Sequence, residues 1–117
     1  MNAEEIACRC ARAADSRKAE NIVVLDVQGI SMVTDFFVIV SGHAEPHLKA
    51  IRDEIEKQLK EGGANPRRVD GIPHSHWVVM DYLDVLVHIF SKERRDFYCL
   101  EQLWGDARKV DWATAAK

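Results

Sequence analysis

Apolar residues recur at steps of three and four in three segments, which is the spacing that places side chains on one face of a helix. The first segment, residues 3–18, predicts a weakly amphipathic helix. The second begins at Pro46 and ends at Gly62-Gly63, as expected when proline lies in the first turn and glycine follows the last. The third predicts a C-terminal helix that starts near Lys92. Its apolar face comprises Phe97, Leu100, Leu103 and Trp104.

Short runs of β-branched and aromatic residues predict the strands. Residues 21–27 (NIVVLDV) and 36–40 (FFVIV) are almost continuously apolar, which indicates strands covered on both faces. Two further strands, HWVVMD and DVLVHIF, are expected to join near Tyr82-Leu83, and a brief strand is expected at residues 68–69. The tail from Lys109 onward is expected to have no regular structure.

The order of these segments predicts the fold class. Helix, two strands, helix, then further strands and a helix favour a layered α/β arrangement. We expect one domain over residues 1–117, with its core between residues 3 and 108. It would hold a mixed sheet of about five strands flanked by helices.

Composition and charge narrow the functional classes. The 117 residues are 47% hydrophobic and 30% charged, which is enough for one core. No apolar run approaches the roughly 20 residues that cross a bilayer, and the N-terminus lacks the layout of a secretion signal, so a cytoplasmic protein without a membrane segment is expected. Because the net charge is -3, a basic protein is a better electrostatic partner than nucleic acid.

The residues that commonly bind metals do not form a recognisable set. Cys8, Cys10 and Cys99 match neither a disulfide framework nor a zinc knuckle, and at least two are expected to be small buried residues. The remaining candidates for metal ligation are His43, His47, His74 and His76. No cysteine or acidic residue stands at a zinc spacing from them, so we expect surface histidines, no metal and no cofactor.

A catalytic alternative rests on Ser41-Gly42 and on two aspartates, Asp81 and Asp84. In a nucleotidyltransferase, a Gly-Ser turn holds triphosphate while paired carboxylates hold magnesium. Two carboxylates on one strand should be two residues apart to share a face, whereas these are three apart and interrupted by a turn. We therefore expect both aspartates to cap the turn in solvent, with a magnesium-dependent nucleotidyltransferase kept as the alternative.

Two ring side chains invite a structural and a functional interpretation. His88 interrupts an apolar strand, so we expect it on a sheet face with a hydrogen-bonded ring nitrogen rather than as a general base. Trp77 begins a predicted strand after HSH. Its indole either packs in the core, which residue type favours, or lies at an exposed edge and anchors a partner.

Two short basic clusters raise the possibility of a contact with RNA. They are Arg67-Arg68 and the group Lys92, Arg94 and Arg95. Acidic residues dilute the second cluster, and no aromatic residues alternate with the basic ones as a single-strand binder requires. Solvated surface is the favoured interpretation of both.

Several ordered segments resemble a known family. They are LDVQG (25–29), TDFFVIVSG (34–42), LKAIRDEIEKQLKE (48–61), WVVMDYLDVLVHIFSKERRDFYCLEQLW (77–104) and the GDA that follows. Together they are similar to the Iojap-related ribosomal silencing factors, in order from about Asn21 to Ala107. The combination of TDFFVIVSG with the later tryptophan, aspartates and histidine is specific.

The resemblance implies a nucleotidyltransferase-like fold without the catalytic residues, and hence a binding protein that is not an enzyme. It implies binding to the large ribosomal subunit through large-subunit ribosomal protein fourteen, which excludes the small subunit and represses translation. Any RNA that the basic clusters contact would then be ribosomal RNA. A monomer or weak homodimer is expected. The positions carried over as partner-binding are Trp77, Asp81, Asp84, His88, Tyr98 and Trp104.

One residue departs from the family pattern. The family usually has glycine between the two aspartates, in D-Y-G-D, and this chain has Leu83 there. If the turn requires a positive φ at that position, leucine would strain it by roughly 1 kcal/mol or more. The placement of Asp84 then depends on how the turn accommodates leucine.

Overall fold

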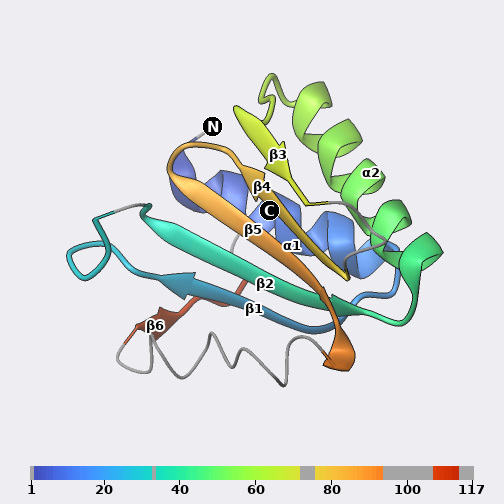
Figure 1. The fold of residues 1–117 in the computed structure, drawn as a ribbon. Coiled ribbons are helices and arrows are strands. Elements are labelled where there is room, and N and C mark those ends of the chain that lie inside the picture. Colours follow the sequence, from blue (N-terminus) through green and yellow to red (C-terminus); the bar gives the residue numbers. More distant parts are fainter. Residues whose placement is uncertain (1, 33, 72–75, 94–106, 114–117) are drawn as a thin grey trace.

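The computed structural model describes residues 2–32, 34–71, 76–93 and 107–113 (Figure 1). Within these residues, six strands form one mixed sheet in the order β3-β4-β5-β2-β1-β6, and two helices pack on one of its faces. The helices are α1 (Ala3–Ser16) and α2 (Glu45–Glu61). The strands are β1 (Glu20–Asp26), β2 (Phe36–Gly42), β3 (Arg68–Asp70), β4 (Trp77–Asp81), β5 (Val85–Ser91) and β6 (Arg108–Lys109). The predicted α/β class with a mixed sheet is thus confirmed.

The centre of the sheet is a parallel pair of long strands. β2 and β5 run side by side from the pair Phe36 and Val85 to the pair Gly42 and Ser91, and every other strand pairing is antiparallel. Every residue of β2 is buried, which confirms that this strand is covered on both faces. The connection between the two parallel strands runs through α2 and the β3–β4 pair.

The strand count of about five was too low, and the expectation of an unstructured tail from Lys109 was wrong. β6 pairs with the end of β1, and the Val110 N–H donates to the Val24 carbonyl oxygen at 2.8 Å. Val110 is buried in the core, while Arg108 forms ion pairs with Glu4 and Asp26. A strand of two residues is too short to show an alternation of apolar and polar side chains, so the sequence could not predict it. It forms because the free edge of β1 is available for pairing.

Both described helices end in a left-handed residue whose neighbours satisfy the last carbonyl groups. After α2, Gly63 has φ +90° and the Ala64 N–H donates to the Leu59 carbonyl oxygen at 2.8 Å. This confirms the end predicted from Gly62-Gly63. After α1, Lys18 has φ 61°, and the Ala19 N–H donates to the Ala14 carbonyl oxygen in the same way. The helix therefore ends at Ser16, two residues before the expected end at residue 18. The predicted C-terminal helix starts near Lys92, and Lys92 and Glu93 are helical. The rest of the predicted helix falls on residues 94–106, outside the described part of the chain.

Two groups of buried side chains lie on the two faces of the sheet. The larger lies between the sheet and the helices and includes Cys8 and Cys10, which confirms that at least two cysteines are small buried residues. Burial raises the pKa of both thiols, which keeps them protonated. The smaller group lies on the opposite face and comprises Leu25, Val27, Phe37, Ile39 and Phe90. No helix in the described part has the length and apolar character to cross a bilayer.

Candidate partner-binding site

Of the four described residues of the predicted site, three lie on one face of the sheet and the fourth lies in a turn at its end. Trp77 and Asp81 point to the same face of β4, because they are an even number of residues apart. His88 lies on that face of β5, opposite Val79, and this is the face turned away from α1 and α2. Asp84 lies in the β4–β5 turn. The other two predicted residues, Tyr98 and Trp104, lie outside the described residues.

Aromatic rings fix the position of Trp77. Its indole stacks on Phe90, its cross-strand neighbour, with ring centroids 5.1 Å apart. Phe90 stacks in turn on His88 at 5.8 Å, with the two rings almost parallel. Phe37 of β2 lies 5.5 Å from the His88 ring. Trp77 is partly buried and packs on the smaller core group, so the structure combines the two interpretations of this residue, core packing and partial exposure.

His88 is held in one protonation state. It is only 9% exposed, and burial lowers its pKa to about 4, so the ring is neutral at pH 7. The Trp77 Nε1–H donates to His88 Nδ1 at 3.4 Å, which leaves the proton of the neutral ring on Nε2. The prediction of a hydrogen-bonded ring nitrogen on a sheet face is therefore confirmed. The buried His88 thus orients the indole of Trp77.

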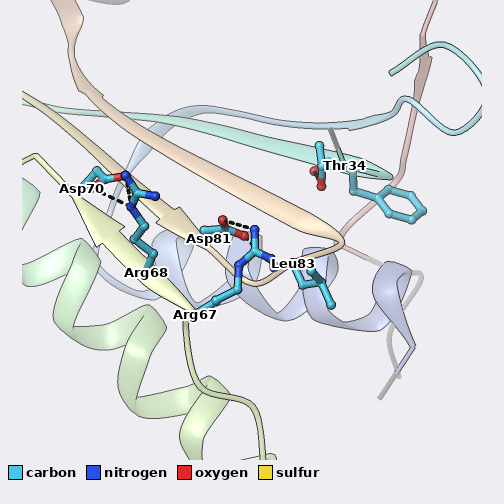
Figure 2. A network of polar contacts seen from close by, with 7 residues as sticks. Thr34, Arg67, Arg68, Asp70, Asp81 and Leu83 are labelled. Carbon is cyan, nitrogen blue, oxygen red and sulfur yellow. Dashed lines mark hydrogen bonds and ion pairs between the residues drawn. The ribbon is translucent and has the colours of Figure 1, made fainter. Parts of the chain in front are cut away.

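Asp81 organises the turn that follows β4 (Figure 2). Its Oδ1 accepts the Leu83 N–H at 2.7 Å, and its Oδ2 accepts a hydrogen bond from Arg67 at 2.8 Å. Partial burial alone would raise the pKa of this carboxyl, but the bonds from Arg67 and the Leu83 N–H outweigh it and hold the pKa below its usual range. Asp81 caps the turn as expected, although it is only 18% exposed and ion-paired rather than fully solvated.

Leu83 adopts the positive φ that its place in the turn requires. Its φ is 75°, and Asp84, the second residue of the two-residue loop, has no positive φ. The Asp84 N–H donates to the Tyr82 carbonyl oxygen at 3.0 Å, so Leu83 is the central residue of a γ-turn with positive φ, which is a rare and strained conformation for a residue with a Cβ. Leucine therefore bears the strain of the positive φ, and Asp84 follows it as the next residue of the turn.

Asp84 joins the turn to the start of β2. Its carbonyl oxygen accepts the N–H groups of Asp35 and Phe36 at 3.0 and 3.1 Å. Its side chain is exposed, and that of Asp35 is partly exposed. Neither carboxylate forms an ion pair with any residue that the structure describes. This end of the sheet thus carries negative charge that is not neutralised within those residues.

The two features behind the nucleotidyltransferase alternative lie at opposite ends of the sheet. The Asp84 carbonyl oxygen contacts the first residue of β2, whereas Ser41-Gly42 ends this seven-residue strand, which spans roughly 20 Å. Gly42 has a packing role as well, because a Cβ there would lie 2.7 Å from the Leu48 side chain of α2. The aspartates and Ser41-Gly42 therefore do not meet in one site.

The other histidines pair with neighbouring groups. His43 is exposed, lies 3.4 Å from Glu20 and stacks on His47. His47 is partly buried, contrary to the surface position expected for it. Its Nδ1 accepts the His43 N–H at 2.9 Å, and its Nε2 donates to the Arg17 carbonyl oxygen at 2.7 Å. No group of three or more possible metal ligands occurs among the described residues, and His74 is outside them.

Sequence reasoning missed the part that Arg67 plays. Arg67 was weighed only as one member of a basic patch, yet it pairs with Asp81, and Arg68 pairs with Asp70. Both guanidinium groups are thus already engaged by carboxylates, which weakens the case for an RNA contact there. The opposite charges were visible in the sequence, but their meeting depends on the register of β3 against β4, which pairs Arg68 with Asp81.

Comparisons with known proteins agree on one family. The sequence matches the family described as "Ribosomal silencing factor during starvation" over residues 1–117. A ribosomal silencing factor of Bacillus subtilis is 41% identical over 111 residues, covering 95% of this chain and 94% of the relative. The chloroplastic protein Iojap of Zea mays is 36% identical, over 86% of this chain and 44% of that protein. A crystal structure from Chromobacterium violaceum has a TM-score of 0.86 at 28% identity, with 99% and 96% of the two chains covered.

Proposed function

The chain belongs to the ribosomal silencing factor family, and from that premise we propose that it binds the large ribosomal subunit through large-subunit ribosomal protein fourteen. In this proposal the bound protein occupies the surface that the small subunit needs, so the subunits do not join and translation is repressed. The mechanism is steric and requires neither a cofactor nor catalysis. We propose that it operates in the cytoplasm, as a monomer or weak homodimer.

The observation that supports this function best is the arrangement of one face and end of the sheet. Trp77 is partly buried, stacked on Phe90 and hydrogen-bonded to His88, so little side-chain freedom is lost when a partner covers it. Aromatic side chains held in this way are frequent centres of binding energy. Asp84 and Asp35 supply negative charge at the end of the same sheet, which favours approach by a basic protein.

Sedimentation of isolated ribosomal subunits tests the proposal. Added protein should shift the mixture from whole ribosomes to free subunits and should sediment with the large subunit alone. Undiminished formation of whole ribosomes at saturating protein would contradict it. Calorimetry with ATP and magnesium should show no heat at millimolar nucleotide, and measurable binding would instead revive the nucleotidyltransferase alternative.

A pair of tryptophan variants tests the site. Trp77→Ala should weaken binding to the large subunit about tenfold or more, because an aromatic anchor is removed. Trp112 is a matched control, since it is also partly buried but packs on the helix side of the sheet. Trp112→Ala should change stability and leave the affinity of the folded protein unchanged. Equal losses of affinity in the two variants would mean that Trp77 acts only through the fold.

A further inference from the structure

Leu83 presents an apolar side chain to solvent at the tip of the β4–β5 turn. The residue is 54% exposed, and its φ of 75° lies in the region that L-residues with a Cβ disfavour. Glycine would relieve the strain, and a polar side chain would be better solvated at this exposed position than leucine. Leucine therefore contributes neither burial nor relaxed geometry at this position, and the stability of the described fold gives no reason for it.

The surrounding backbone holds the turn in place. The Leu83 N–H is fixed by Asp81, whose other carboxylate oxygen is held by Arg67. The Tyr82 N–H donates to the Val85 carbonyl oxygen at 2.9 Å, and the Asp84 carbonyl accepts two N–H groups from the start of β2. A strained residue persists when its neighbours fix it in several ways, and such residues concentrate at functional sites. The leucine side chain is thus displayed on a preorganised support.

The charges around the tip indicate what kind of surface would receive it. Asp84 follows Leu83 directly, and the Asp35 N–H bonds to the Asp84 carbonyl oxygen at 3.0 Å. Neither carboxylate has an ion-pair partner within the described residues, whereas the nearby Arg67 is already paired with Asp81. An apolar tip beside unpaired carboxylates complements a protein surface with an apolar socket and basic side chains around it. The same carboxylates would repel the phosphates of RNA.

We infer that Leu83 is an apolar anchor of the partner-binding surface, inserted into a socket of a basic ribosomal protein on the large subunit. The inference rests on the proposed function and adds to it a contact residue and the chemistry of the surface it meets. Leu83 and Trp77 then define two separate points of contact, one at the end of the sheet and one on its face.

Three substitutions at this position separate binding from folding. Leu83→Gly and Leu83→Asn keep the turn and remove the apolar side chain, while Leu83→Met keeps an apolar side chain in the same backbone. Titrated co-sedimentation with isolated large subunits should give a Kd about tenfold weaker for the first two, equivalent to about 1.4 kcal/mol, and within about twofold of wild type for the third. The urea midpoint of Leu83→Gly should equal or exceed that of wild type.

Val69 provides the control, since it is 38% exposed but lies on β3 opposite Met80, and so on the helix side of the sheet. Val69→Asn should bind like wild type, and an equal loss of affinity there would indicate non-specific apolar capture and overturn the inference. If wild type binds and the glycine and asparagine variants at position 83 bind equally well, the inference fails while the proposed function stands. If wild-type protein does not sediment with large subunits, the proposed function itself fails.

Discussion

The indole N–H of Trp77 donates a hydrogen bond to Nδ1 of His88 across the β4–β5 pair, with 3.4 Å between the two nitrogens. The two residues are diagonal neighbours, because Trp77 pairs directly with Phe90, and His88 with Val79. The bond requires an unprotonated Nδ1, and burial keeps the ring neutral. The orientation of the tryptophan is therefore coupled to the charge state of a buried histidine.

This coupling predicts a specific loss of stability in mild acid. Burial lowers the pKa of His88 from 6.5 to about 4, so the unfolded chain takes up a proton at pH values where the folded protein does not. The contribution is complete above about pH 6.5 and is lost as the pH falls toward 4. Between pH 7 and pH 5, wild type should lose about 2 kcal/mol more free energy of unfolding than His88→Gln, measured by urea denaturation. Parallel pH profiles would contradict this.

Asp81 should contribute more to stability than its ion pair alone provides. Asp81→Ala removes the acceptor of the Leu83 N–H and should cost about 1–2 kcal/mol in free energy of unfolding. Arg67→Ala should cost less than about 1 kcal/mol, because Arg67 is 62% exposed and its pair is screened by water. Urea denaturation of both single variants and the double variant gives the coupling free energy between Arg67 and Asp81. Asp70→Ala is the control, since Asp70 pairs with Arg68 and its carboxylate caps no turn within the described residues, and a cost equal to that of Asp81→Ala would refute the turn argument.

Tyr82→Phe should leave the protein equally stable or make it more stable. The Tyr82 side chain is 7% exposed, and its hydroxyl has no hydrogen-bond partner in the described structure. Burial also raises the pKa of this hydroxyl above its usual value. Because an unsatisfied buried hydroxyl is costly, its removal should change the free energy of unfolding by between zero and about +1 kcal/mol. A clear loss in thermal or urea denaturation would reveal a partner for the hydroxyl.

Lys18→Gly should stabilise the end of α1. Lys18 has φ 61° at the position where helices commonly carry glycine, and the bonds on either side of it close the helix end. Glycine should raise the free energy of unfolding by about 0.5–1 kcal/mol. Lys18→Ala removes the same charge without relieving the backbone, so it should bring no gain. A similar gain in both variants would assign the effect to charge.

The parts of the fold that sequence predicted well are those with a long or repeated pattern. The helix α2 carries apolar residues at every third or fourth position between a proline and two glycines, so it was recognised almost to the residue. The strands β2 and β5 are mostly apolar runs, which is typical of strands inside a sheet covered on both faces. The local pattern of apolar residues is sufficient to predict an element when most residues of that element contribute to the pattern.

The parts that sequence did not predict depend on contacts between distant segments. β6 is too short to show a period, and the pairing of Arg67 with Asp81 follows from strand register. The partial burial of Trp77 depends on Phe90 and His88, which lie on another strand. For the candidate site, the resemblance to the family identified the residues. Their burial or exposure depends on neighbours in space, so only the structure showed it.

The parallel pairing of β2 with β5 also bears on the order in which the chain can fold. Phe36 pairs with Val85 and Gly42 with Ser91. One whole edge of β2 therefore stays unpaired until α2, β3, β4 and then β5 have been synthesised. Contacts between such distant positions slow folding and leave an apolar strand edge exposed in the nascent chain. Ribosome-bound intermediates of this protein that end before β5 should therefore depend on chaperones more than the released chain does.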